Sequence, residues 1–178
     1  CGTILETATW VTNADRAAPL GYDATQLAAA NRDAVAMLCD LRAQTGASDV
    51  LISATIGPRG DGYTPDSFMS APEAETYHAA QIGTLSETAC DMISGYTLCY
   101  AEEAIGIVRA ASKTGKPIVI AFTVETDGKL PSGQPLDAAI DQVDAETDGA
   151  ALYFMVNCAH PTHFEAALTR HPRLRGVV

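Results

Sequence analysis

Short apolar runs alternate with longer segments of helical periodicity along the whole chain. Six runs have the aliphatic and β-branched composition of buried strands, and they occupy residues 3–7, 49–56, 91–94, 117–123, 154–158 and 174–178. Between them, apolar positions recur at helical spacing over residues 25–45, 73–87, 101–113, 136–145 and 162–170. We expect Thr25 to cap the first of these helices and Gly46 to end it.

This strict alternation of strand and helix predicts an α/β fold with a parallel sheet. A Rossmann fold would place Gly-x-Gly-x-x-Gly after an early strand, whereas Thr-Ala-Thr-Trp follows Glu6 here. We therefore predict a (β/α)8 TIM barrel of which this chain covers about strands 2 to 7, as a single partial barrel domain over residues 1–178. Because so few strands cannot close such a barrel, we expect both ends of the sequence to be cut within the fold.

Composition and charge narrow the possible partners. The chain has 178 residues, of which 47% are hydrophobic, enough for one core of ordinary size. Its formal net charge of −11 argues against nucleic acid or an anionic membrane surface as a partner and leaves small molecules. No run approaches the roughly eighteen apolar residues of a transmembrane helix. Five cysteines without a Cys-x-x-Cys pair indicate reduced thiols in a cytoplasmic protein.

One apolar run ends abruptly in Asn157 and Cys158. Ligands bind at the carboxyl ends of parallel strands, so Cys158 is a candidate metal ligand or nucleophile. Two other interpretations stay open: Cys158 as a small buried hydrophobic residue, and a local zinc site with His160 and His163, although His163 is expected to face solvent. An unrelated barrel enzyme such as an aldolase would need a lysine at a strand end, whereas Lys116 precedes its strand.

Five segments, in order, also match a known family of barrels. Residues 7–13, Thr-Ala-Thr-Trp-Val-Thr-Asn, are similar to that family's Thr-Asn-Thr-Tyr-x-Ala-Ser turn after strand two, and Ile-Gly-Pro at 56–58 is similar to its loop after strand three. Segments 85–104 and 122–136 match its fourth and fifth βα units, and Val-Asn-Cys at 156–158 matches the end of strand six. On these residues the chain resembles the homocysteine S-methyltransferase family, the zinc-dependent barrels that include betaine–homocysteine and S-methylmethionine–homocysteine methyltransferases.

The resemblance implies a site and a reaction. In that family the strand-six cysteine is one of three thiolates that hold zinc, and a late Gly-Gly-Cys-Cys motif supplies the other two. Cys158 is thus implied to be a Zn2+ ligand, with its two partner cysteines outside the sequence given. Asn157, Thr7 and Trp10 are implied to line the substrate pocket, where an aromatic face attracts a cationic donor. The implied reaction moves a methyl group from a sulfonium or quaternary ammonium donor to a thiol acceptor, homocysteine, as in methionine biosynthesis.

One position departs from the family pattern. The family's fourth strand usually ends in a Glu that holds the amino group of homocysteine, but Tyr96 takes that place here. A neutral phenol does not supply the same charge, so Tyr96 is expected to line the pocket and Glu6 is a candidate replacement. This departure leaves an alternative, a catalytically inactive barrel homologue that acts as a small-molecule-binding or interaction protein. His78 is interpreted as an ordinary residue on a helix surface.

Overall fold

The computed structural model describes residues 2–46, 48–65, 67–165 and 171–178. The strands are β1 (Thr3–Glu6), β2 (Val50–Ile56), β3 (Met92–Leu98), β4 (Ile118–Phe122), β5 (Phe154–Val156) and β6 (Leu174–Val177). The helices are α1 (Ala14–Ala17), α2 (Ala24–Thr45), α3 (Ala71–Ser86), α4 (Ala101–Ser112), α5 (Leu136–Glu146) and α6 (Pro161–Phe164), with a short 3-10 helix at Ala18–Leu20.

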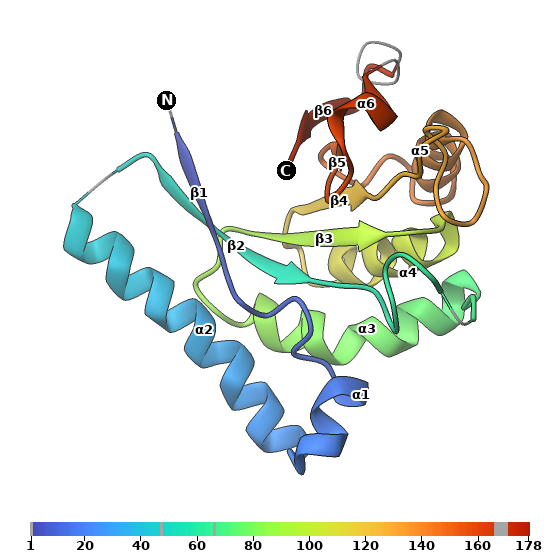
Figure 1. Ribbon diagram of the computed structural model, residues 1–178. Helices are drawn as coiled ribbons and strands as arrows, with labels where there is room; N and C mark the ends of the chain where they lie inside the picture. Colours follow the sequence, from blue (N-terminus) through green and yellow to red (C-terminus); the bar gives the residue numbers. More distant parts are fainter. Residues whose placement is uncertain (1, 47, 66, 166–170) are drawn as a thin grey trace.

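The strands form one sheet in the order β1-β2-β3-β4-β5-β6. Every neighbouring pair is parallel, with Leu5 opposite Ile52 and Ile120 opposite Phe154. Helices α2 to α5 follow the sheet along one side, and the sheet curls away from them as part of a barrel would (Figure 1). The structure therefore confirms the α/β class and the curled parallel sheet.

The two faces of the sheet differ in what covers them. The outer face packs on the helices, and its strand residues join helix residues in one cluster that includes Ile52, Ile93, Ile120, Val35 and Ile105. The inner face carries a separate, smaller cluster that consists of Met92, Tyr96, Val119, Ala121 and Met155, with Trp10 and Tyr153 packed against it. Side chains of alternating direction on each strand produce this division.

An irregularity in β3 changes that alternation near its end. The register between β3 and β4 shifts between Gly95 and Leu98, and Thr97 has a left-handed backbone with φ of 61°. Tyr96 keeps the inner-face direction of Met92, whereas Leu98, which regular alternation would place on the same face, joins the outer cluster. A bulge of this kind re-aims side chains at the end of a strand.

Several local predictions need correction. Asp23, not Thr25, caps α2, because its side chain accepts from Gln26 N–H while the Gln26 side chain accepts from Asp23 N–H. The strand predicted over 91–94 runs on to Leu98, and helix α1 lies where a loop was expected. His78 is not on a surface: it is 1% exposed. Of the helix predicted over 162–170, residues 166–170 lie outside the described residues.

Because the strands are parallel, their carboxyl ends meet at one edge of the sheet. The residues for which the sequence predicts a site follow β1 and β5 or lie near the end of β3, and this edge is called the carboxyl edge below. Within the part of the chain that the structure describes, no helix has both the length and the hydropathy that crossing a membrane requires.

Candidate functional site

Cys158 lies exposed at the carboxyl edge, directly after β5. The buried side chain of Asn157 holds it from one side, with Nδ2 3.3 Å from the Cys158 sulfur. The same amide is fixed to β3, since its Oδ1 accepts Thr97 N–H at 2.9 Å and its Nδ2 donates to Thr97 Oγ1 at 2.8 Å. Thr97 Oγ1 also lies 3.9 Å from the sulfur. The sulfur is therefore presented to the edge by a rigid polar frame.

The backbone at this frame adopts a conformation that side chains other than glycine rarely take. Cys158 has φ of 53° and Thr97 has φ of 61°. A left-handed conformation at such residues costs roughly 1–3 kcal/mol each and persists where the surroundings fix it, often at functional sites. A left-handed backbone is least favourable for a β-branched residue, so the conformation of Thr97 is the less usual of the two. Two such residues in mutual contact make this point of the edge a candidate functional site.

The loop from β2 to α3 reaches the same sulfur. A hydrogen bond between the Tyr63 hydroxyl and Cys158 raises the pKa of Tyr63 to about 12, with partial burial as the second cause. The preceding Gly62 packs so closely on β3 that a Cβ there would lie 2.8 Å from the Thr97 carbonyl oxygen. Tyr63 therefore belongs to the site, although it was not among the residues predicted for it.

Trp10 is the aromatic residue predicted after β1, and its indole is held on two sides. Its Nε1 donates to the Tyr96 carbonyl at 3.1 Å. A Cβ at Gly57 would lie 2.6 Å from Trp10 Nε1, so only a glycine lets the indole pack against the end of β2. The ring packs on the inner-face cluster and remains partly exposed. The structure thus brings Trp10 and Tyr96 together at the carboxyl edge.

Tyr96 reaches across the inner face to the first strand. Its hydroxyl donates to Glu6 Oε1, so the two strand ends on either side of β2 are connected. Burial first, and the hydrogen bond with Glu6 second, raise the pKa of Tyr96 far above its usual range. Tyr96 therefore remains a neutral donor, and the exposed Glu6 supplies the negative charge at this place.

Thr7 lies at the same edge but turns into the structure. It is 4% exposed, its Oγ1 accepts Thr55 N–H at 2.9 Å, and it lies 2.6 Å from Thr9 Oγ1. These bonds fasten the loop after β1 to the end of β2. They use the Thr7 hydroxyl within the protein, and its contact with a substrate stays a prediction.

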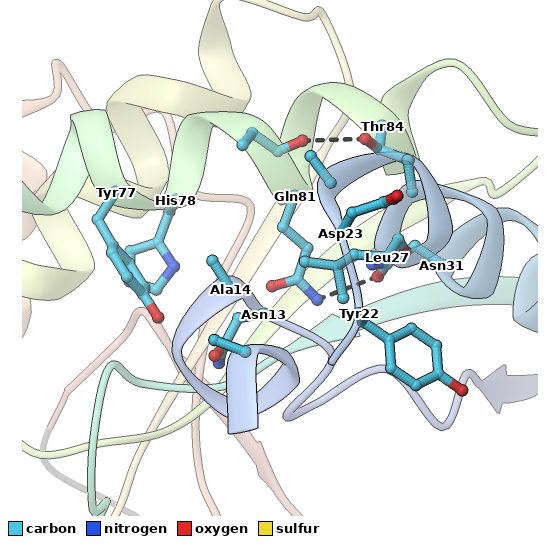
Figure 2. A pocket seen from close by; sticks show the side chains of 14 residues that line it. Asn13, Ala14, Tyr22, Asp23, Leu27, Asn31, Tyr77, His78, Gln81 and Thr84 are labelled. Carbon is cyan, nitrogen blue, oxygen red and sulfur yellow. Dashed lines mark hydrogen bonds between the residues drawn. The ribbon is translucent and has the colours of Figure 1, made fainter. Parts of the chain in front are cut away.

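A cavity of about 320 Å³ lies between α1, α2 and α3 on the helix side of the sheet. Figure 2 shows Asn31 and Gln81 meeting there, with Gln81 Nε2 donating to Asn31 Oδ1 at 3.1 Å. Both amides also bond to the loop that carries Trp10: Gln81 to the Thr9 carbonyl at 2.9 Å, and Asn31 to the Thr12 carbonyl at 3.0 Å. The cavity is thus bordered by the contacts that fix this loop.

Within the described part of the chain, the thiol that a metal at the carboxyl edge would meet is Cys158. Among the described residues, no three His, Cys, Asp or Glu side chains converge as a metal site would require. The local site of Cys158 with His160 and His163 is therefore not formed. The exposed, oriented Cys158 sulfur fits a zinc ligand, provided that further ligands come from elsewhere.

Lys116, the lysine considered for an aldolase, lies away from the carboxyl edge. Its Nζ donates to the Thr88 and Cys90 carbonyls at the opposite edge of the sheet.

Comparison with known proteins assigns the family. The model of the homocysteine S-methyltransferase family matches residues 2–175. The chain therefore belongs to the homocysteine S-methyltransferase family. A comparison with curated protein sequences gives no match.

Solved structures agree with this at the level of the fold. The metallated homocysteine methyltransferase MmuM from Escherichia coli superposes with a TM-score of 0.81 at 18% identity, covering 97% of this chain and 65% of that one. Its oxidized form gives 0.79 at 20% identity, covering 93% and 60%. D-psicose 3-epimerase gives 0.51 at 14% identity, covering 99% and 72%. The chain thus spans less than two thirds of the MmuM chains it matches.

Two residues of the frame were missing from the sequence-based site. Thr97 was overlooked because Ser94 and Gly95 interrupt the apolar run, so the strand was expected to end at residue 94, whereas it runs on to Leu98. Tyr63 follows a turn in which the Asp61 side chain accepts Tyr63 N–H at 2.7 Å and Thr64 N–H at 3.0 Å. The Asp-Gly pair signals such a turn, but nothing in the sequence indicates that it faces Cys158.

Proposed function

We propose that this chain is the central part of a (β/α)8 barrel enzyme, equivalent to about strands 2 to 7, that transfers a methyl group to a thiol. The donor is a sulfonium or quaternary ammonium compound, and the acceptor is homocysteine or a similar aminothiol. Zn2+ is held by Cys158 together with two cysteines supplied from outside residues 1–178. The single observation that carries the proposal is the exposed Cys158 sulfur, fixed by Asn157 and Thr97 at the carboxyl edge of a chain of this family.

In the proposed reaction the methyl group passes directly from donor to acceptor, and no side chain of the protein bonds to it. The acceptor thiol loses its proton to solvent, its sulfur attacks the methyl carbon, and the carbon–sulfur or carbon–nitrogen bond of the donor breaks with its electron pair leaving on the donor. Bound zinc supplies the acidity that makes a coordinated thiol ionise near neutral pH. The residues of this chain orient the reactants, which is the larger part of the work in such a displacement.

Asn157 would perform that orientation at the metal ligand. Its amide is bound on both polar atoms to Thr97, so the sulfur of Cys158 keeps one direction. Trp10 would offer its partly exposed face to the cationic donor, since a positive charge over an indole is attracted by the ring. Its hydrogen bond to the Tyr96 carbonyl fixes the ring beside the place where the acceptor enters.

Glu6 and Tyr96 would select the acceptor. The carboxylate of Glu6 lies next to the position that carries a Glu in the resembled family, and the Tyr96 hydroxyl orients it. An ammonium group on the acceptor would pair with Glu6 and keep its thiol directed at the carboxyl edge. A thiol without an amino group would lose this contact.

The test is methyl transfer from labelled S-methylmethionine or betaine to homocysteine by the protein as its gene encodes it. Cys158→Ala should remove the transfer, because a metal site with two thiolates holds zinc poorly. Cys39→Ala, which removes a half-buried thiol on α2, is the matched control and should transfer as the parent does. Full activity in Cys158→Ala would contradict the proposal.

A second candidate function rests on Tyr96, where a Glu is expected. A barrel that binds the aminothiol without transferring a methyl group would keep the Glu6–Tyr96 pair and need no zinc. Calorimetry with homocysteine on zinc-free protein separates the two. Binding that is equally tight with and without zinc, and without methyl transfer, favours the binding protein.

A further inference from the structure

The helical layer holds a cavity that the proposed methyl transfer does not use. It has a volume of about 320 Å³ and lies between α1, α2 and α3. Ligand pockets in proteins start at roughly 300 Å³, and an engineered apolar cavity of about 150 Å³ already takes up benzene. The exposed residues Tyr22, Ala24 and Ala80 are among those that line it, so the cavity opens to the surface. It therefore has the size and the access for a molecule built on one or two rings.

The walls of the cavity are mostly apolar and carry little charge. Small side chains from all three helices, among them Ala14, Ala28 and Ala80, leave the space between the helices unfilled. None of the described residues that line the cavity is a lysine or an arginine. The carboxylate of Asp23 is used to cap α2, where it accepts Gln26 N–H at 2.8 Å. An anion would find no opposite charge in these walls, which suit an uncharged and largely apolar molecule.

One wall of the cavity offers a free hydrogen-bond acceptor. The Gln81 amide is oriented by its nitrogen, since Nε2 donates to the Thr9 carbonyl at 2.9 Å and to Asn31 Oδ1 at 3.1 Å. Its oxygen, Oε1, accepts no hydrogen bond from any described residue, and Figure 2 shows it turned toward Ala14 on the far side of the amide from Asn31. The contacts that fix the Trp10 loop therefore also hold this oxygen toward the cavity.

A donor without a partner lies four positions before Gln81, on the same face of α3. The Tyr77 hydroxyl is buried, and no described residue hydrogen-bonds to it, although buried hydroxyl groups nearly always have a partner. The guanidinium of Arg59 lies over the Tyr77 ring, 4.7 Å from its centroid, and holds the ring in place. Burial, with the charge of Asp15 as the second cause, raises the pKa of Tyr77 to about 12, so the hydroxyl keeps its proton. An unused donor and an unused acceptor therefore lie side by side on this wall.

We propose that the cavity between α1, α2 and α3 binds a small uncharged aromatic molecule that carries an amide or lactam group. The N–H of that group donates to Gln81 Oε1, its carbonyl accepts from the Tyr77 hydroxyl, and its ring packs on the alanines of the walls. Because the same Gln81 amide donates to the Thr9 carbonyl, a bound molecule stabilises the loop that carries Trp10. The consequence for a methyl donor at Trp10 rests on the proposed function, but the binding itself does not.

The test is a titration of the protein as its gene encodes it with benzamide, followed by NMR of the backbone amides. We expect a Kd on the order of 1 mM, as a ligand of this size allows, with shifts at the amides of α1, α2 and α3. Benzoate, which carries a negative charge, and toluene, which lacks the amide, should each bind at least about fivefold more weakly. Toluene that binds as tightly as benzamide, or benzamide that shifts only amides elsewhere, would overturn the proposal.

Two tyrosines that line the cavity make the test specific. Tyr77→Phe removes the unpartnered hydroxyl and breaks no hydrogen bond of the protein, so it should keep the Tm and weaken benzamide binding about five- to tenfold. Tyr22→Phe is the matched control, because the Tyr22 hydroxyl points away from the cavity (Figure 2), and it should bind benzamide as the parent does. Unchanged benzamide affinity in Tyr77→Phe would contradict the proposed contact.

A change of volume and a measurement of exchange complete the test. Ala28→Leu fills the cavity from α2 and should weaken benzamide binding about tenfold or more, whereas Ala29→Leu, at the exposed neighbouring position, should not. Equal affinity in Ala28→Leu and the parent would place benzamide outside the cavity. Saturating benzamide should also slow hydrogen exchange of the Thr12 N–H, which donates to the Thr9 carbonyl at 3.0 Å. Binding that leaves this exchange rate unchanged would overturn the link to the Trp10 loop.

Discussion

Tyr96 on β3 donates a hydrogen bond to the carboxylate of Glu6 on β1, across the intervening strand β2. The contact places a negative charge beside the position at which the resembled family carries its own carboxylate. Since Tyr96 belongs to the buried inner-face cluster and Glu6 is exposed, the phenol is the fixed partner and the carboxylate is the accessible one. We therefore expect recognition of an ammonium group on the proposed acceptor to depend on Glu6.

Glu6→Gln should weaken that recognition. Loss of a charge-assisted bond should raise the KM for an aminothiol about tenfold or more, with kcat less affected. The KM for a thiol of similar size without an amino group should stay the same. Glu87→Gln, which removes an exposed charge near the opposite edge, is the control. Equal KM values for both acceptors in Glu6→Gln and the parent would show that Glu6 does not bind the acceptor.

Tyr96 should also make the fold sensitive to alkali. Its pKa is raised in the folded protein above the usual value of 10.0, by burial and by the bond to Glu6. The unfolded chain then releases the phenol proton at a lower pH than the folded chain, so the stability from Tyr96 is complete below that value and is lost as the pH rises through the folded pKa. Between about pH 8 and about pH 11, the Tm of Tyr96→Phe should therefore fall less than that of the parent. A parallel fall in both proteins would refute this role.

Gly57 should not tolerate a side chain. A Cβ there would lie 2.7 Å from the Trp10 carbonyl oxygen, an atom that cannot move as a side chain can. Gly57→Ala should cost about 1–3 kcal/mol in the free energy of unfolding, measured by urea denaturation. Gly83→Ala is the matched control, because on α3 its Cβ meets nothing within 4 Å and should stabilise the helix by roughly 0.4–1 kcal/mol. Similar changes in both variants would exclude the close packing of Trp10 on β2.

Asn157→Ala should weaken metal binding as well as the fold. It leaves the buried Thr97 N–H without its acceptor and frees the Cys158 sulfur to turn. Outer partners of a metal ligand typically change affinity by roughly 10–100-fold, and we expect a loss of that size in a zinc competition assay. Asn31→Ala removes an equally buried amide between α2 and α3 and should reduce stability alone. An equal loss of zinc affinity in Asn31→Ala would show that the loss comes from destabilisation of the whole fold and not from the contact between Asn157 and Cys158.

The alternation of apolar runs and helical segments predicted the six parallel strands, because the central strands β3, β4 and β5 are buried along their whole length and leave a continuous apolar signal. The position of Cys158 at a strand end followed from the same pattern. The cap of α2 was assigned wrongly because Thr25 and Asp23 both suit a cap, and only the reciprocal bonds with Gln26 decide between them. The end of β3 was missed because Ser94 and Gly95 interrupt the apolar signal before the bulge at Thr97.

Contacts between segments that are distant along the chain could not be predicted from the sequence. The residues around His78 in its own helix do not distinguish a buried position from an exposed one. Its burial depends on Glu103, which lies 25 positions further along the chain. The place of Tyr63 depends on the direction of a loop that Glu103 and Gly62 set together. Periodicity describes how one element faces the core, and it carries no information on which two polar groups from different elements meet.

The central claim is that Cys158 is a zinc ligand, and the zinc content of the purified protein tests it most directly. Measured by inductively coupled plasma mass spectrometry after dialysis, the protein as its gene encodes it should hold about one zinc per chain. Cys158→Ala should hold almost none, while Cys39→Ala should match the parent. Full zinc occupancy in Cys158→Ala would contradict the account.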